Sequence, residues 1–198
     1  MKVFTFHTGG KYKASANALK ESVESIGLEC VVIERPDLGS WWKNCNQKCE
    51  VVLDALNTYG DEPIIWNDSD TRYLVYPELF DAIEEDFAAY YMTPSICIGG
   101  TLFFNGKTKA KRYVEAWVKN VQQNPTLEDD SINFRRALQS IKPQSIHHLP
   151  PSYCWNEKCM RSGFPHAKPV IAHEYQGAHD YPVITLEDDK VVPPSRRA

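Results

Sequence analysis

The chain has 198 residues, of which 42% are hydrophobic and 12% aromatic, and its formal net charge is −4. This length suits one domain, in which folding buries roughly 70% of the surface that the unfolded chain exposes. The negative net charge argues against a nucleic-acid backbone as the main partner, because neutralising phosphates requires clustered Lys and Arg. It does not exclude a small anionic ligand, which needs only a local pocket.

The ends of the chain and its apolar segments bear on location. No stretch approaches the ~20 apolar residues of a membrane span. Residues 1–6 are too short and too mixed for a signal peptide, so we expect a cytoplasmic protein. We expect a single domain over residues 1–190, followed by a flexible tail at 191–198.

The first half of the chain alternates short apolar segments with segments of helical periodicity. The predicted order is a strand at 2–6, a helix capped by Ser15 and ended by Gly27, a strand at 29–34, a helix at 44–59 and a strand at 63–67. This order is typical of an α/β fold with a parallel sheet and helices on its faces. In such sheets ligands bind beyond the carboxyl ends of the strands.

The second half is less regular. It predicts a short helix at 79–83, strands at 87–91 and 96–104, and helices at 109–123 and 129–141. From residue 142 onward, proline and short apolar runs indicate loops and edge strands.

Six cysteines raise the question of a metal or disulfide framework. Cys45 and Cys49 form one close pair, and Cys154 and Cys159 form a second. Both spacings fall within the range of zinc ligands, so a four-cysteine zinc site is one interpretation. Ordinary buried thiols are the other.

Two acidic residues, Asp68 and Asp70, directly follow the third predicted strand. In an extended segment such residues project to the same side, where the two carboxylates repel each other unless a cation lies between them. Mg²⁺ or Mn²⁺ takes one or two protein carboxylates and completes its coordination with water and phosphate oxygens. A diphosphate leaving group needs such a cation because negative charge accumulates on it. A plain solvated turn is the alternative.

With its surroundings, this motif resembles the nucleotide-diphospho-sugar glycosyltransferases of the GT-A fold. The matching segments are Asp68-Ser69-Asp70, Gly39-Ser40-Trp41 with Asn44 and Lys48, Gly99-Gly100-Thr101, Glu128-Asp129-Asp130, and His173 after Val170-Ile171-Ala172. The resemblance implies a single-domain, Rossmann-type α/β fold with a mainly parallel central sheet flanked by helices. It also implies metal-dependent transfer of a sugar from a nucleoside-diphosphate donor, commonly a UDP-sugar in this family, to an acceptor that the sequence does not identify.

The resemblance implies a metal site as well. Asp70 would bind Mn²⁺ or Mg²⁺ directly, while Asp68 would contact the metal or the donor ribose. His173 would be the third protein ligand, and His166 and His179 compete with it for this role. The plain alternative for His173 is a hydrogen-bonded surface histidine.

Further residues are implied as donor-binding or catalytic groups. The donor-binding set comprises His7, Thr8, Tyr12, Asn44, Lys48, Asp68, Gly99 and Gly100. Within it, Tyr12 would stack on the base unless it is a core aromatic, Lys48 would pair with phosphate unless it is merely solvated, and the two glycines would approach a sugar or form a β-bulge. Asp129 and Asp130 are the catalytic candidates, as partners of sugar hydroxyls or as the base for the acceptor, although carboxylates are favoured at a helix N-terminus regardless of function.

Two other functions are open. A haloacid-dehalogenase-type phosphatase also places Asp-x-Asp after a buried strand, with the first Asp as nucleophile. That pattern has Thr or Val at the position where this chain has Arg72. It also normally follows the first strand of its domain, whereas the motif here follows the third predicted strand. A non-catalytic nucleotide- or carbohydrate-binding module is the second alternative, in which Trp41, Trp42, Tyr90 and Tyr91 would serve as sugar platforms.

Overall fold

A computed structural model describes residues 1–93, 96–124, 130–142, 144–160 and 163–174 of the chain. Its centre is a six-stranded sheet with the order β2-β1-β3-β6-β5-β7. The strands are β1 (Lys2–His7), β2 (Glu29–Glu34), β3 (Ile64–Asn67), β5 (Phe87–Thr93), β6 (Ile96–Phe104) and β7 (Ile146–His148). A separate antiparallel pair consists of β4 (Thr71–Tyr73) and β8 (Ile171–His173).

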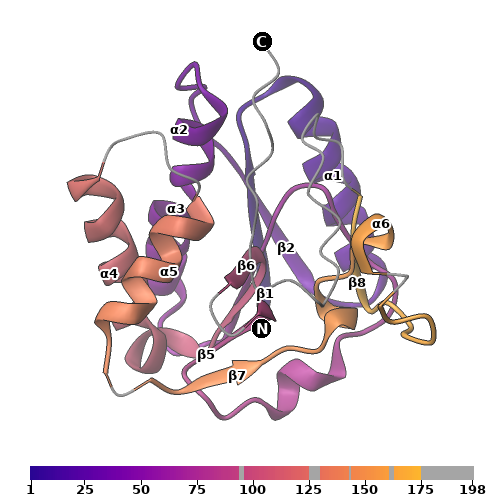
Figure 1. Cartoon of the computed structure of the whole chain (residues 1–198). Coiled ribbons are helices and arrows are strands. Elements are labelled where there is room, and N and C mark those ends of the chain that lie inside the picture. The colour runs from indigo at the N-terminus through magenta and orange to yellow at the C-terminus, as the bar shows by residue number, and fades with distance from the viewer. Residues whose placement is uncertain (94–95, 125–129, 143, 161–162, 175–198) are drawn as a thin grey trace.

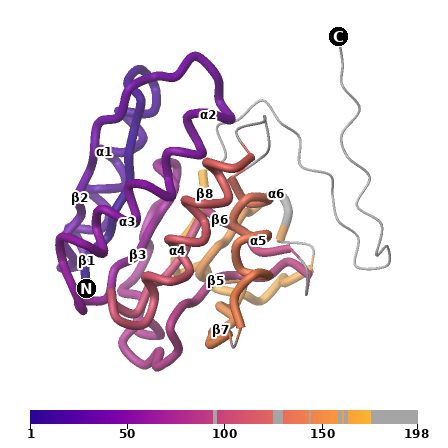
Figure 2. Tube along the Cα trace, turned by 90° about the vertical axis from the view of Figure 1, so that its left-hand side faces the viewer, coloured from indigo at the N-terminus to yellow at the C-terminus, as the bar shows by residue number. Residues whose placement is uncertain are grey.

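Helices cover both faces of this sheet. They are α1 (Gly10–Ser25), α2 (Trp41–Asn46), α3 (Lys48–Tyr59), α4 (Gly106–Gln123), α5 (Asp130–Ser140) and α6 (Glu157–Met160), with short 3₁₀ turns at η1 (Glu78–Ala82) and η2 (Pro151–Tyr153). Figure 1 shows α3, α4 and α5 on one side of the sheet, and α1 with α6 and β8 on the other. Figure 2 shows the sheet extending from β2 and β1 to β5 and β7.

The predicted α/β fold with helices on both faces of a mostly parallel sheet is confirmed. β1 pairs in parallel with β2 and β3, and β5 pairs in parallel with β7. The remaining two pairings, β3 with β6 and β5 with β6, are antiparallel. The order β-α-β-α-β of the first half therefore builds the parallel part, and β6 enters it from the opposite direction.

Alternation along the strands explains why both faces are covered. Phe4, Ile64 and Trp66 belong to one buried cluster, together with residues of α3, α4 and α5. Val3 and Ile65, their neighbours in sequence, belong to a second cluster on the other face, with residues of α1 and η2. Successive side chains of a strand point to opposite faces, so a continuous apolar run needs an apolar layer on each side.

Two details of the predicted helices are wrong. Ser15 does not cap the first helix, because α1 begins at Gly10 and Ser15 lies inside it. The turn before α1 uses Gly9 at φ 90°, a conformation that glycine adopts without strain. The predicted helix at 44–59 is two helices, α2 and α3, which meet at Gln47.

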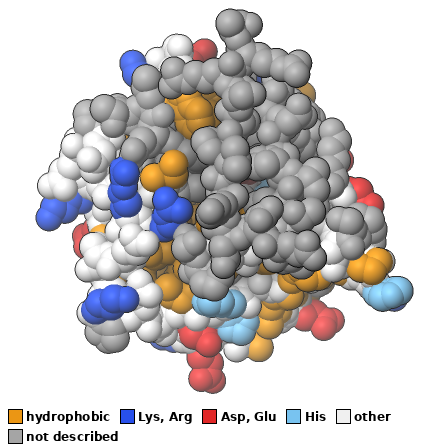
Figure 3. Space-filling view, viewed as in Figure 1, with side chains coloured by type: hydrophobic (Ala, Val, Ile, Leu, Met, Phe, Trp, Pro, Cys, Tyr) orange, Lys and Arg blue, Asp and Glu red, His pale blue; other side chains and the backbone are white. Residues whose placement is uncertain are grey.

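The surface charge is uneven. Lys and Arg side chains gather on the left of Figure 3, where Figure 1 places α4 and α5.

In the part of the chain that the structure describes, no helix is long and apolar enough to cross a membrane. The predicted tail at 191–198 lies outside the described residues.

Candidate functional site

The candidate site forms where β3 ends beside the first half of β6. Asn67, the last residue of β3, pairs with Thr101. The next amide, the N–H of Asp68, donates to the carbonyl of Gly100 at 3.0 Å. Because β6 runs antiparallel to β3, this pairing brings Gly99 and Gly100 to the carboxyl edge of the parallel strands, next to the acidic motif.

The pairing of β6 with β5 shifts its register at the two glycines. On β5, Ala89 pairs with Leu102 of β6, whereas the following residue, Tyr90, pairs with Ile98. Residues 99–101 are therefore an insertion in β6 relative to β5. The register shift agrees with the β-bulge interpretation of the two glycines.

The acidic motif is a turn rather than an extended segment, so the prediction that both carboxylates project to one side of a strand is wrong. β3 ends at Asn67, and the amide of Thr71 donates to the carbonyl of Asp68 at 3.0 Å, which closes a four-residue turn into β4. The two carboxylates consequently have different partners. Asp68 contacts Lys48, and Asp70 faces His173.

Lys48 is the centre of the first group of contacts. Only 5% of its side chain is exposed, and its ammonium lies 2.8 Å from Oδ1 of Asp68 and 2.5 Å from Oδ2 of Asp130. It also donates to the carbonyl of Gly99 at 3.2 Å and lies 5.4 Å from the ring centroid of Trp66. An ammonium has three protons, and these three acceptors match them.

This environment decides the charge of Lys48. Burial of the ammonium disfavours its charged form, but Asp130 and Asp68 outweigh burial and hold the pKa of Lys48 well above its ordinary value. The side chain is thus a buried cation between two carboxylates. The predicted contact of Lys48 with donor phosphate stays a prediction.

His173 is the centre of the second group of contacts. Its Nδ1 lies 3.8 Å from Oδ1 of Asp70 and 3.3 Å from Oγ1 of Thr71. Its Nε2 lies 3.2 Å from Oγ1 of Thr101 and 3.6 Å from Sγ of Cys154. Burial of the ring lowers the pKa of His173, but Cys154 and Asp70 raise it, and the net value is about 10.

The two glycines separate these two groups. A Cβ built on Gly99 would lie 3.4 Å from Nζ of Lys48 and 3.5 Å from Oδ2 of Asp130, which are ordinary contacts. A Cβ built on Gly100 would overlap Cε1 of His173 and lie 3.0 Å from its Nδ1. The imidazole therefore packs directly against a strand backbone that carries no side chain.

Asp70 and His173 fit a divalent cation as a pair. In the described parts of the chain, no three or more His, Cys, Asp or Glu side chains form a group that could hold a metal ion by themselves. A carboxylate and an imidazole nevertheless face each other, and 29% of the Asp70 side chain is exposed. Mg²⁺ and Mn²⁺ are commonly bound by one or two protein groups together with substrate phosphates. The donor set therefore suits a cation that arrives with a diphosphate and displaces the proton of His173.

The residues predicted to line the donor pocket come from the end of β1, the start of α1 and from α2. His7 is buried, and its Nδ1 accepts from the amide of Gly9 at 3.2 Å. Thr8 is half-buried and Tyr12 is 37% exposed. Asn44 organises the loop before it, since its side chain accepts from the amide of Leu38 and donates to Asp37. Of these residues, Tyr12 offers an accessible aromatic surface.

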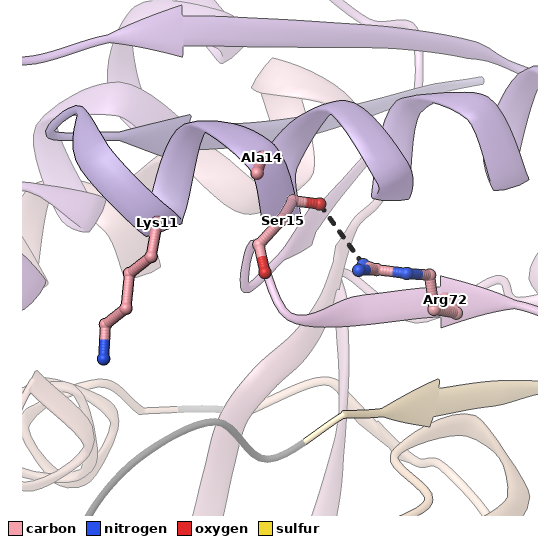
Figure 4. Close-up of a pocket in the computed structure, with 4 residues that line it drawn as sticks. All are labelled: Lys11, Ala14, Ser15 and Arg72. Atoms are coloured by element: carbon pink, nitrogen blue, oxygen red, sulfur yellow. Dashed lines mark hydrogen bonds between the residues drawn. The ribbon is translucent and has the colours of Figure 1, made fainter.

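A hollow of about 280 Å³ lies between α1 and β4. Figure 4 shows its lining residues, Lys11, Ala14, Ser15 and Arg72, with the guanidinium of Arg72 bonded to the carbonyl of Ser15 at 3.2 Å. Arg72 also pairs with Glu174 at 3.0 Å, which ties the segment after β8 to β4. The hollow thus adjoins the turn that carries Asp70.

Of the other predicted residues, some lie away from this site and some lie outside the described residues. Asp129 and His179 lie outside the described residues, and His166 is exposed on the loop before β8. Tyr90 is buried at 7% exposure, so its predicted role as an exposed sugar platform is wrong. Cys49 and Cys154 are buried in different clusters of the core.

Four residues of the site were not among the predicted ones. Trp66 donates from Nε1 to Oδ1 of Asp68 at 3.1 Å. His173 is contacted by Thr71, Thr101 and Cys154. The strand alternation carried a signal for Trp66, because it stands two residues before Asp68. Nothing local in the sequence indicated Cys154, whose contact depends on how β8 packs.

We expect Lys48→Met to destabilise the protein by about 3–5 kcal/mol at pH 7, because it leaves the carboxylates of Asp68 and Asp130 without their cation. The deficit should shrink at pH 4, where protonation removes the uncompensated charges. Urea unfolding at both pH values measures this, with Lys43→Met on the exposed side of α2 as the matched control. Equal losses in the two variants would show that the ion pairs contribute nothing.

We expect Gly100→Ala to displace the ring of His173 and to cost about 1–3 kcal/mol of folding free energy through overpacking. Gly99→Ala is the control, because a methyl group there makes only ordinary contacts. Chemical denaturation gives the two stabilities, and the NMR signals of His173 report its displacement. An unshifted His173 in Gly100→Ala would contradict the packing described here.

Solved structures share this fold. A glycosyltransferase involved in the glycosylation of the major capsid of PBCV-1 superposes with a TM-score of 0.64 and 14% identity, over 89% of this chain and 93% of that one. The glycosyltransferase GlyE of Streptococcus pneumoniae TIGR4 superposes with a TM-score of 0.60 and 12% identity, over 97% of this chain and 58% of that one. No protein-family profile and no curated protein matches the sequence. At these identities the likeness concerns the fold, and it confirms the resemblance to glycosyltransferases at that level.

Proposed function

We propose that the protein is a divalent-metal-dependent glycosyltransferase that uses a nucleoside-diphosphate sugar, most simply a UDP-sugar. The observation that carries the proposal is the meeting of Asp70 with His173, which stand 103 positions apart in the sequence. They face each other beside a second acidic residue, Asp68, at the carboxyl edge of β3. The fold shared with two glycosyltransferases supports the same reaction class.

In this proposal Asp70 and His173 hold Mn²⁺ or Mg²⁺, and Asp68 contacts either the metal or the donor ribose. When bound, the cation supplies positive charge to the diphosphate as it leaves. Lys48 and Trp66 fix one oxygen of Asp68, at 2.8 and 3.1 Å. This restraint holds the carboxylate of Asp68 in one orientation. The carboxylate therefore need not reorganise when the cation or the donor ribose binds.

The sugar is proposed to lie against Gly99, where β6 presents bare backbone. Asp130, at the start of α5, is held in place by Lys48 at 2.5 Å. A carboxylate fixed in this way suits the orientation of a sugar hydroxyl, and this is the role we assign to it. Lys48 acts through Asp68 and Asp130, so we consider it a positioning residue.

The nucleoside is proposed to lie along the start of α1. Tyr12 offers an exposed ring there, and the ammonium of Lys11 lies 5.3 Å from the centroid of that ring. Lys11 also lines the hollow beside Arg72. An aromatic face and a nearby cation suit a base and a phosphate, respectively.

Calorimetric titration with UDP, with and without Mn²⁺, tests this proposal. We expect binding in the presence of Mn²⁺ that weakens at least tenfold when EDTA removes the metal. Asp70→Asn should abolish the effect of Mn²⁺, because the amide is a poor ligand for a hard cation. The matched control is Asp54→Asn, since Asp54 is exposed on α3.

A screen for hydrolysis of sugar nucleotides then separates an enzyme from a binding module. Slow metal-dependent release of UDP from one donor supports the transferase. Metal-dependent binding without turnover of any donor would favour the module. UDP binding that ignores both Mn²⁺ and the Asp70→Asn substitution would overturn the proposed mechanism.

A further inference from the structure

Both nitrogens of His173 have defined neighbours, and the two sides of the ring differ. Nδ1 faces the carboxylate of Asp70 at 3.8 Å, on the partly exposed side, and the hydroxyl of Thr71 at 3.3 Å. Nε2 faces inward, toward the hydroxyl of Thr101 at 3.2 Å and the sulfur of Cys154 at 3.6 Å. The two inward neighbours are buried, with Thr101 at 0% and Cys154 at 3% exposure.

We propose that Thr101 and Cys154 are positioning residues that hold Nε2 of His173, so that Nδ1 is the nitrogen offered to the divalent cation. This inference rests on the proposed function and adds to it which nitrogen is used and which residues select it. In metal sites the group bonded to one ring nitrogen fixes which nitrogen ligates the metal. Here that group is a hydroxyl, supplemented by a thiol.

Thr101 is itself held by a chain of hydrogen bonds. Nδ2 of Asn67 donates to Oγ1 of Thr101 at 2.9 Å, and the hydroxyl of Tyr73 donates to Oδ1 of Asn67 at 2.6 Å. All three residues are buried. The hydroxyl that meets Nε2 is therefore fixed by β3 and β4, and turning the ring would break its contact with this hydroxyl.

Cys154 is held by the backbone around β8. The carbonyl of Trp155, the next residue, accepts from the amide of His173 at 2.7 Å. The amide of Trp155 in turn donates to the carbonyl of Ile171 at 2.9 Å. These bonds set the spacing of Cys154 and His173 independently of either side chain. The ring also packs directly against Gly100, since a Cβ built there would overlap its Cε1.

Pulsed electron–nuclear double resonance with Mn²⁺ and UDP tests which nitrogen binds. Two samples carry histidine labelled with ¹⁵N only at Nδ1 or only at Nε2. We expect the strong coupling of a directly bound nitrogen in the Nδ1-labelled sample, and its loss in His173→Ala. Strong coupling in the Nε2-labelled sample would overturn this inference and leave the proposed function standing. Absence of a histidine coupling in both samples would overturn the role of His173 in the proposed metal site.

Mn²⁺ affinity, measured from the signal of free Mn²⁺, tests the positioning residues without an activity assay. We expect Thr101→Val and Cys154→Ala to weaken Mn²⁺ binding by about 10–100-fold, the range for second-shell partners of a ligating histidine. Thr101→Ser should restore most of the affinity, because it keeps the hydroxyl. Cys30→Ala is the control for loss of a buried thiol, as Cys30 packs in the same cluster as Cys154. Unchanged affinity in both Thr101→Val and Cys154→Ala would overturn the inference.

Discussion

The site depends on two consecutive residues without side chains in the middle of β6. Lys48 with Asp130 occupies the space beside Gly99, and His173 packs against Gly100. Alternate residues of a strand face opposite sides, so two adjacent glycines thin the sheet on both faces at one point. The bulge that contains them also carries the carbonyl that fixes Asp68. Because this backbone carries no side chains, Lys48 and His173 can both approach the acidic turn.

Asp68 and Asp70 have different partners because of this geometry. Asp68 is neutralised by Lys48, a buried cation of the protein itself, whereas Asp70 faces the imidazole of His173. In our proposal the protein therefore supplies an incomplete cation site, which the phosphates of the donor complete. Binding of metal and donor would then be coupled, because each supplies part of the other's environment.

The fold was predictable where the signal is local, and the site was predictable only in part. β2 and β6 have the predicted bounds, since apolar runs end there at charged or turn residues. The break at Gln47 was missed because the helical periodicity continues through it. Asp70 and His173, which were predicted to share a metal ion, lie next to each other, but the turn at Asp68 was not foreseen, and neither was the contact of Cys154. Both depend on long-range pairing, of β3 with β6 and of β4 with β8.

The central claim is that Asp70 and His173 share a divalent cation. The most direct measurement is a crystal structure with Mn²⁺ and UDP, with diffraction data collected at the manganese absorption edge. We expect an anomalous peak within bonding distance of the Asp70 carboxylate and of Nδ1 of His173, with phosphate oxygens completing the coordination. UDP bound without a peak at this position, or a peak whose ligands include neither residue, would contradict it.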